Sequence, residues 1–355
     1  DLFGQSPRNP NNEKITQFHM DIACSIQKVT EEIMIKLTKS ICSEYKIKNL
    51  CMAGGVALNC VANGKILKEK IFDNIWIQPA AGDAGGSLGA ALAFWHHELE
   101  KPRVEYKDQM KGSYLGPKFE NAQIEEKLKS LSANFKKCHR DEIISLTAKE
   151  LANEKTVGWF QGRMEFGPRA LGGRSILADP RSEKMQKKLN LKIKFRESFR
   201  PFAPSVLAKE LETWFQGSPE SPYMTFVMEV QDEKKRKLAE DVSTLKGLDL
   251  LAAIRSVIPA VTHVDYSARV QSVHTDTNPL FHQLISEFFE ITGCPMLINT
   301  SFNVRGQPIV CRPEDAIDCF FGTGLDFLFI GDFCVAKKDN LALQEKNYNE
   351  IFPPD

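Results

Sequence analysis

The chain has 355 residues, of which 42% are hydrophobic, and it carries 46 lysines and arginines against 46 aspartates and glutamates. A formal net charge of zero excludes a whole-chain field that would gather nucleic acid or an anionic membrane, so any anion chemistry must be local. The length exceeds what a single hydrophobic core usually supports, and we expect two domains of unequal size.

Nine cysteines are spread along the chain without a CxxC pair, and several lie in apolar runs. This pattern favours buried thiols in a reducing cytoplasm over a disulfide framework. No apolar run reaches the roughly 18 residues that a membrane span needs. The chain opens on Asp1 and a loop-like segment instead of a leader. We therefore expect a cytoplasmic protein without membrane or nucleic-acid partners, excised from a longer polypeptide.

The first hundred residues predict an α/β unit. Over 12–45 the apolar residues recur at steps of three and four, which indicates a helix with one buried face and with Asn11 or Asn12 as its N-cap. Strands at 50–53 and 74–78 each run into a glycine-rich turn and a helix, an order typical of α/β proteins. The residues of the expected buried face are Ile15, Phe18, Ile22, Ile26, Val29, Ile33 and Leu37.

A charged segment with few apolar residues, 98–112, predicts a linker, and we place the domain boundary between residues 104 and 105. Beyond it we expect a second domain of mixed α/β or α+β type. Its helices are expected at 121–131, 141–153, 182–193, 279–292 and 313–321, and its strands at 156–160, 175–178, 202–207, 295–299 and 327–335.

Both glycine-rich turns of the first unit are candidates for ligand binding. Gly54 and Gly55 end a strand just before a helix that contains Asn59, and such glycines let backbone N–H groups approach a phosphate or ribose closely. Asp83 exposes one carboxylate in the second turn, at the carboxyl end of a strand where a metal ligand is well placed. A tight strand-to-helix turn and a turn-stabilising aspartate explain the two patterns equally well.

The richest segment is basic and runs from Gly162 to Leu207. Arginine grips phosphate or carboxylate oxygens in pairs, whereas lysine offers a compact point charge. Lysines at 184, 187, 188 and 192 have the spacing of a solvated helix face. Six other basic residues of this segment stand beside Gly, Pro, Phe and Ala, where a charge without a function would be costly to desolvate. The phosphate candidates are therefore Arg163, Arg169, Arg174, Lys194, Arg196 and Arg200.

Two later segments add polar groups. Asn299, Thr300 and Ser301 end an apolar strand, with Asn303 just beyond, and such amides and hydroxyls suit a small planar group or a ribose, or cap their own turn. His263, which we expect in an apolar strand, is a possible base or ligand, but an isolated histidine in such a strand is more often a hydrogen-bonded core residue. The neighbouring Arg269 is the stronger binding candidate.

These segments resemble one family, the O-carbamoyltransferases of nodulation-factor and antibiotic biosynthesis (NodU/CmcH/TobZ type), over nearly the whole chain. The resemblance implies that 1–104 form the second half of an actin-like (ASKHA) nucleotide-binding domain. It implies that 105–355 form a YrdC-like α+β domain with a twisted mixed sheet. The segments are GGVALNC, AGDAGGSLGAAL, GRMEFGPRALGGRSILADPR, KFRESFRPFAPSVL, PAVTHVDYSARVQ and NTSFNVRGQPIVCRPEDAIDCF.

The resemblance also implies a two-stage reaction. Carbamoyl phosphate and ATP, with Mg²⁺, give carbamoyl adenylate in the YrdC-like domain, and the actin-like domain transfers the carbamoyl group to a hydroxyl of a small-molecule acceptor. That acceptor is a sugar, an antibiotic or a nodulation-factor-like compound. The implied catalytic residues are Arg163, Lys194, Arg196, Arg200, Asn299 and Ser301. The implied cofactor-binding residues are Gly54, Gly55, Asn59, Arg169, Arg174, Arg269, Thr300 and Asn303, and Asp83 is the implied ligand of Fe²⁺ or another divalent metal.

One departure from the family pattern matters for function. The family's transfer domain begins with a β-sheet half that supplies two histidine metal ligands, and nothing before Gly54 resembles it. We therefore expect an incomplete metal site here, with activation retained and transfer doubtful. Two alternatives stay open: an RNA-modification factor that forms threonylcarbamoyl adenylate, and a nucleotide-binding module without chemistry.

Overall fold

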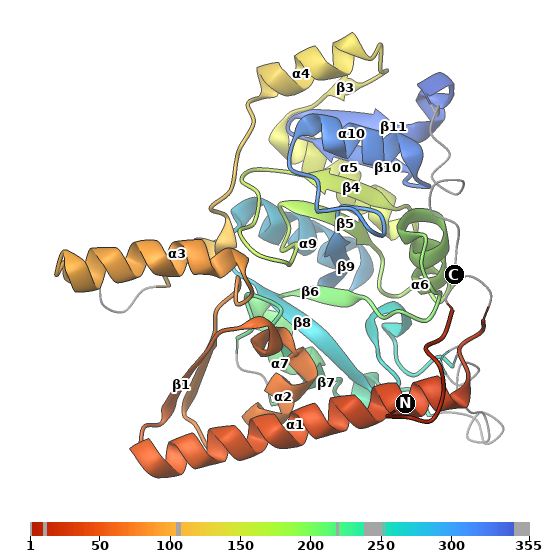
Figure 1. The fold of residues 1–355 in the computed structure, drawn as a ribbon. Coiled ribbons are helices and arrows are strands. Elements are labelled where there is room, and N and C mark those ends of the chain that lie inside the picture. The colour runs from red at the N-terminus through yellow and green to blue at the C-terminus, as the bar shows by residue number, and fades with distance from the viewer. Residues whose placement is uncertain are drawn as a thin grey trace.

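The computed structural model describes residues 2–9, 13–103, 108–217, 220–237, 251 and 253–343. The first part of the chain forms a two-stranded sheet and the second part a nine-stranded mixed sheet (Figure 1). The predicted α/β class with a large mixed sheet is therefore confirmed. The predicted boundary between residues 104 and 105 lies outside the described residues. No described helix is long and apolar enough to cross a membrane.

The first part has the predicted order of strand, glycine turn, helix, strand, glycine turn and helix. Its two strands run parallel, with Leu50 opposite Ile75. A small apolar core that includes Met34, Ile66 and Phe72 joins the long first helix to the helix between the strands. The elements are α1 (Gln17–Tyr45), β1 (Asn49–Met52), α2 (Cys60–Lys68), β2 (Asn74–Ile77) and α3 (Ala84–Ala93).

The predicted burial of the apolar face of α1 is wrong over most of its length. Ile26 is 62% exposed and Leu37 is 57% exposed, whereas the side of the helix that packs on α2 buries Met34 and Cys42. Periodicity reports that a helix has an apolar stripe, but it does not report which part of the molecule covers that stripe. The helix is capped by Thr16, and the predicted caps Asn11 and Asn12 lie outside the described residues.

Helix α3 is also exposed to solvent in the described part of the chain. None of its residues is buried, and Figure 1 shows it extending away from both sheets. It continues into a π-helical turn, Phe94–Glu98, in which Phe94 and Trp95 are exposed. Together α1 and α3 present large apolar side chains that the described residues do not cover.

The large sheet has the strand order β3-β11-β10-β4-β5-β9-β6-β8-β7. The pairs β10–β4 and β6–β8 run parallel, and the other neighbours run antiparallel. The strands are β3 (Lys136–Lys137), β4 (Val157–Phe160), β5 (Arg174–Ala178), β6 (Ala203–Leu207), β7 (Phe226–Glu229), β8 (Ser267–Val273), β9 (Met296–Ser301), β10 (Phe327–Ile330) and β11 (Phe333–Ala336).

Helices cover this sheet and enclose its core. α5 and α9 pack against each other, α9 also contacts β6 and β9, and α10 contacts β4 and β10. Phe281 and Phe288 of α9 and Trp159 of β4 are fully buried in one continuous core. The helices are α4 (Asn121–Ser130), α5 (Arg140–Ala152), α6 (Met185–Leu189), α7 (Leu211–Trp214), α9 (Pro279–Thr292) and α10 (Pro313–Gly322).

Two predicted elements of the second part differ from the structure. The single strand expected at 327–335 is the hairpin β10–β11, because Gly331 turns the chain with φ of 53°. A Cβ at Gly331 would also lie 2.5 Å from Oδ1 of Asn121. Both the positive φ and the lack of space for a side chain therefore require glycine. The segment around His263 lies outside any strand, and the strand β8 that follows it was not predicted.

The two parts of the chain are joined by a close contact between α2 and β7. A Cβ at Gly64 would lie 2.6 Å from the carbonyl oxygen of Val227, so only glycine lets the helix approach this closely. Nδ2 of Asn63 donates to the carbonyl oxygen of Thr225 at 3.0 Å. This contact places α2 beside the start of β7 in the large sheet.

The exposure of the α1 stripe predicts how substitutions affect stability. Leu37→Gln should change the free energy of unfolding of this chain by less than about 0.5 kcal/mol, because the site is exposed. Met34→Ala should lower it by about 2 kcal/mol, because it leaves a cavity in the small core. Urea unfolding followed by circular dichroism measures both. A loss for Leu37→Gln as large as that for Met34→Ala would contradict the orientation of α1.

His263 makes stability depend on pH. Burial lowers its pKa to about 4, and its Nδ1 lies 3.3 Å from Oγ of Ser267. Below pH 6.5 the unfolded chain takes up a proton that the folded chain does not, so stability falls as the pH drops towards 4. The His263 contribution between pH 7 and pH 5 should be roughly 2 kcal/mol. Urea unfolding at both pH values should show that His263→Gln loses less stability on acidification than the parent; equal losses would contradict the prediction.

Candidate functional site

A cavity of about 250 Å³ lies where the ends of β6, β8 and β9 meet the loop that carries Arg169. Its walls bring together residues from five segments that are up to 133 residues apart in the sequence, taking Pro168 and Ser301 as the ends. Seven of the predicted site residues line it: Arg169, Arg196, Arg200, Arg269, Asn299, Thr300 and Ser301. We call this the arginine cavity.

Each arginine reaches the cavity from a different local structure. Arg269 lies on β8. Arg196 follows the π-helical turn Asn190–Lys194, which Phe195 ends with a left-handed φ of 48°. Nε of Arg196 donates to Oδ1 of Asn190 at 2.7 Å, and its guanidinium lies over the ring of Phe202 at 5.0 Å. These contacts fix the side chain before any ligand binds.

The electrostatics of the cavity favour an anion. Burial, followed by the charge of Arg269, lowers the pKa of Arg169 to about 10. Burial, followed by the charge of Arg200, lowers the pKa of Arg196 to about 10. Glu197 pairs with Arg200 at 2.8 Å, but among the described residues no carboxylate forms an ion pair with the other three arginines. A bound phosphate would relieve this repulsion.

Two buried polar atoms of residues that line the cavity have no hydrogen-bond partner among the described residues. Nε of Arg269, a donor, and Oδ1 of Asn299, an acceptor, form no hydrogen bond with any described residue. Buried polar groups are rarely left unpaired in folded proteins. The cavity therefore suits a ligand that combines anionic oxygens with at least one N–H donor.

Lys194 does not line this cavity, but it contacts Ser301, which does. It is 3% exposed, and its Nζ donates to the carbonyl oxygen of Ser301, to Oδ1 of Asn303 at 2.8 Å and to the carbonyl oxygen of Asn303 at 3.0 Å. Burial, followed by the charge of Arg196, lowers its pKa to about 7. Lys194, at the end of the π-helical turn Asn190–Lys194, thus contacts the turn after β9 that carries Asn303, and together they hold Ser301 in position.

Arg174 is also a supporting residue in its observed position. It is fully buried, its guanidinium lies 3.6 Å from the ring centroid of Phe160, and it donates to the carbonyl oxygens of Gln161, Gly162, Gly173 and Pro117. It therefore ties together the two ends of the loop 161–173. It does not line the arginine cavity.

Glu165 shapes the same loop and was missed in the sequence analysis. Its Oε1 accepts hydrogen bonds from the backbone N–H groups of Leu171, at 2.6 Å, and Gly173, at 2.7 Å. Burial raises its pKa. Glu165 is the only acidic residue in the glycine-rich stretch 162–174, which carries three arginines, and this is the sequence signal that could have identified it.

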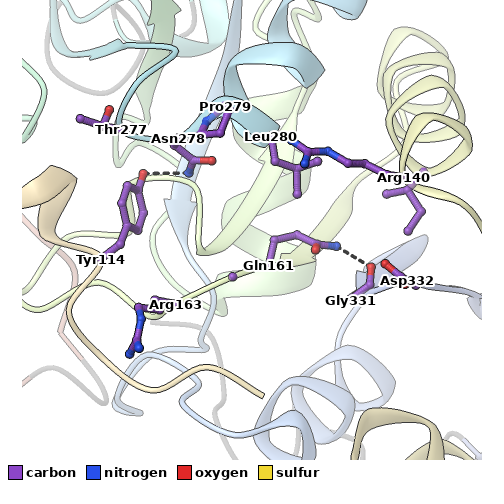
Figure 2. Close-up of a pocket in the computed structure, with 12 residues that line it drawn as sticks. Tyr114, Arg140, Gln161, Arg163, Thr277, Asn278, Pro279, Leu280, Gly331 and Asp332 are labelled. Carbon is purple, nitrogen blue, oxygen red and sulfur yellow. Dashed lines mark hydrogen bonds between the residues drawn. The ribbon is translucent and has the colours of Figure 1, made fainter. Parts of the chain in front are cut away.

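Arg163 lines a different cavity, of about 400 Å³, together with Tyr114, Arg140, Gln161 and Asn278. Figure 2 shows the Arg163 side chain directed away from the other labelled side chains, and its Nη1 donates to the carbonyl oxygen of Gly116 at 3.0 Å. The structure therefore separates Arg163 from Arg169, Arg196 and Arg200, with which it was grouped as a phosphate candidate. Its predicted role in phosphate binding stays a prediction.

The turn that follows β2 approaches the loop that carries Arg169. A Cβ at Gly167, in the loop that carries Arg169, would lie 3.1 Å from the carbonyl oxygen of Pro79, just after β2. Gly54 has a φ of 99°, and, chain neighbours aside, no heavy atom of the described residues lies within 4 Å of a Cβ built at Gly54 or Gly55. Open space thus lies beside the predicted nucleotide turn.

Asn59 and Asp83 have contrasting surroundings. Oδ1 of Asn59 caps α2 by accepting from the N–H of Ala62 at 3.2 Å, and its Nδ2 donates to Gln27. Asp83 is exposed at the start of α3. The described residues contain no group of three or more His, Cys, Asp or Glu side chains placed to hold a metal ion. Asp83 alone does not form a metal site, so we derive no chemical step through a metal.

Comparison with known proteins adds the following findings. Two family models match: Carbamoyltransferase N-terminus over residues 1–92 and Carbamoyltransferase C-terminus over residues 148–337. An uncharacterized protein of Synechocystis is 53% identical over 100% of this chain and 58% of its own length. Nodulation protein NolO of Bradyrhizobium diazoefficiens is 40% identical over 91% of this chain and 56% of its own length. Nodulation protein U of Rhizobium tropici is 35% identical over 78% and 41%.

The chain thus spans little more than half the length of the first two of these relatives. Among solved structures, full-length HypF in its phosphate- and nucleotide-bound form matches with a TM-score of 0.34 and 18% identity, over 58% of this chain and 22% of HypF. A likeness this slight carries no argument about function. The two family models together cover more than two thirds of the sequence, and the chain belongs to the carbamoyltransferase family.

Proposed function

We propose that the arginine cavity binds carbamoyl phosphate and ATP and forms carbamoyl adenylate. The observation that carries this proposal is the convergence of Arg169, Arg196, Arg200 and Arg269 on one cavity in which three of them lack a carboxylate partner among the described residues. Family membership supports carbamoyl chemistry. The second part of the chain would then be a YrdC-like activating domain, and the first part would belong to an actin-like transfer domain.

The proposed activation reaction takes place in two steps, and the atoms balance in each. Water first cleaves carbamoyl phosphate into carbamate and inorganic phosphate. A carbamate oxygen then forms a bond to the α-phosphorus of ATP while the bond to pyrophosphate breaks, which gives carbamoyl adenylate. The arginines would neutralise the phosphate charge that repels the anionic nucleophile, and they would stabilise the charge that develops on the leaving pyrophosphate. Mg²⁺ would enter as the complex with ATP.

Transfer to an acceptor hydroxyl is proposed for the longer protein. Gly167, in the loop that carries Arg169, approaches Pro79, and the N–H of Gly54 donates to the carbonyl oxygen of Ala81 in the same turn. This arrangement would keep the adenylate's path between the two parts short. The exposed apolar faces of α1 and α3 are proposed to pack against the polypeptide by which the relatives exceed this chain in length. That polypeptide would supply the partners of Asp83 in a metal site and part of the acceptor site.

The activity test incubates the chain with ATP, Mg²⁺ and carbamoyl phosphate, and it measures pyrophosphate release and the mass of the adduct. The parent should release pyrophosphate only when carbamoyl phosphate is present. Arg269→Gln should lower the rate roughly 10- to 100-fold, because a charged hydrogen bond to phosphate is lost. Lys187→Gln, an exposed cation on α6, is the matched control and should keep the parent rate.

Three outcomes would count against the proposal. The first is ATP binding without pyrophosphate release, which would favour the binding-module alternative. The second is release that depends on bicarbonate and threonine instead of carbamoyl phosphate, which would favour the RNA-modification alternative. The third is an equal loss of rate in Arg269→Gln and Lys187→Gln, which would remove the arginine cavity from the reaction.

A further inference from the structure

Three buried polar side chains lie in a row beneath the arginine cavity, on three adjacent strands. Ser205 of β6, Gln271 of β8 and Asn299 of β9 are 0%, 3% and 1% exposed. Ser205 lies opposite Gln271 in the register of β6 and β8. Polar side chains at such positions stabilise a fold only when each finds a partner, so their hydrogen bonds determine what they can do.

The direction of hydrogen bonding through this row is fixed at one end by the backbone. Nε2 of Gln271 donates to the carbonyl oxygen of Leu171 at 2.9 Å, so the other end of its amide is the oxygen. That oxygen accepts from the hydroxyl of Ser205, at 2.5 Å, and from Nδ2 of Asn299, at 3.0 Å. A flipped Gln271 would place its oxygen against the carbonyl oxygen of Leu171, which excludes the reverse order.

The same logic fixes the amide of Asn299. Its Nδ2 faces three oxygens: Oε1 of Gln271, Oγ of Ser205 at 2.9 Å and the carbonyl oxygen of Ala170 at 3.2 Å. A flipped amide would bring its oxygen against two acceptors that carry no proton. Oδ1 of Asn299 is therefore held on the opposite side, where it has no partner among the described residues. Asn299 lines the cavity.

We propose that the Ser205–Gln271–Asn299 row presents Oδ1 of Asn299 as an acceptor for the amine of a carbamoyl group, and that this contact selects carbamoyl phosphate over acyl phosphates without an amine. A carbamoyl group carries an N–H donor and a carbonyl acceptor on one carbon. Two residues that line the cavity carry the matching pair, the unpaired Oδ1 of Asn299 and the unpaired Nε of Arg269. Acetyl phosphate has a methyl group in place of the amine and would leave Oδ1 unpaired.

This inference rests on the proposed function, because it assumes that the phosphate of the ligand lies among the arginines. Sites that hydrogen-bond a donor of their substrate reject analogues that lack it far better than apolar pockets reject a change of size. We expect a preference for carbamoyl phosphate over acetyl phosphate of roughly 10- to 100-fold in affinity. Asn299 would contact the ligand, whereas Ser205 and Gln271 would act as positioning residues.

The test is calorimetric titration of the chain with carbamoyl phosphate, acetyl phosphate and inorganic phosphate. The parent should prefer carbamoyl over acetyl phosphate at least tenfold. Asn299→Leu, which keeps the volume and removes the acceptor, should bring that ratio to within about threefold of unity while inorganic phosphate binds as before. Gln271→Met should reduce the ratio with Asn299 itself intact, a result that a merely structural role of Gln271 would not produce.

Comparison of the two acyl phosphates on the parent requires no variant to fold, and Ser205→Ala is a milder second variant that should lower the ratio partway. Equal affinities of the parent for the two acyl phosphates, with inorganic phosphate bound, would overturn this inference and leave the proposed function standing. An unchanged ratio in Asn299→Leu would do the same. Failure of all three phosphates to bind would overturn the proposed function and this inference with it.

Discussion

The cavity at the ends of β6, β8 and β9 concentrates positive charge that the described residues do not neutralise, and the rest of the site is arranged around that constraint. Like charges that approach one another in a partly dry environment raise the free energy of the folded state. Burial first, and then the charge of a neighbouring arginine, lower the pKa values of Arg169 and Arg196. A protein keeps such a cluster when a bound ligand compensates the positive charge during function. The cluster lowers the stability of the folded protein when the ligand is absent.

Three other charged residues make the cluster possible without lining the cavity. Lys194 holds the turn after β9 through Ser301 and Asn303. Arg174 donates to three backbone carbonyls at the two ends of the loop 161–173 and to that of Pro117. Glu165 accepts backbone N–H groups from the same loop. The basic segment therefore has two kinds of members: some satisfy backbone groups inside the protein, and others face the cavity. Their sequence context, rich in Gly, Pro and Phe, is the same.

Much of the fold could be predicted from local pattern. Helix α9 begins and ends at the predicted residues 279 and 292, because its proline start and glycine end punctuate a clear apolar periodicity. The apolar stripe of α1 was recognised but assigned to the wrong surroundings, since the material that covers a stripe is a property of the tertiary structure. Strand β8 was missed because it carries Arg269 and Gln271 among its apolar residues, and these are the side chains that serve the cavity.

The residue types of the candidate site were predictable from the sequence, but the distribution of these residues between the two cavities was not. Arginines, an amide and hydroxyls were grouped by residue type, and seven of them do line one cavity. Arg163 and Arg169 are only six residues apart, yet the loop between them turns about buried Glu165 and directs them into different cavities. Ser205 and Gln271 gave no local signal, because their importance lies in contacts between strands that are distant in sequence.

The most direct measurement is a crystal structure of the chain soaked with carbamoyl phosphate and an ATP analogue that is not cleaved at the α-phosphorus. The account predicts phosphate density within hydrogen-bonding distance of Arg169, Arg196, Arg200 and Arg269, in the cavity that Asn299 lines. Phosphate density beside Arg163 and Arg140, with the arginine cavity free of ligand, would contradict it.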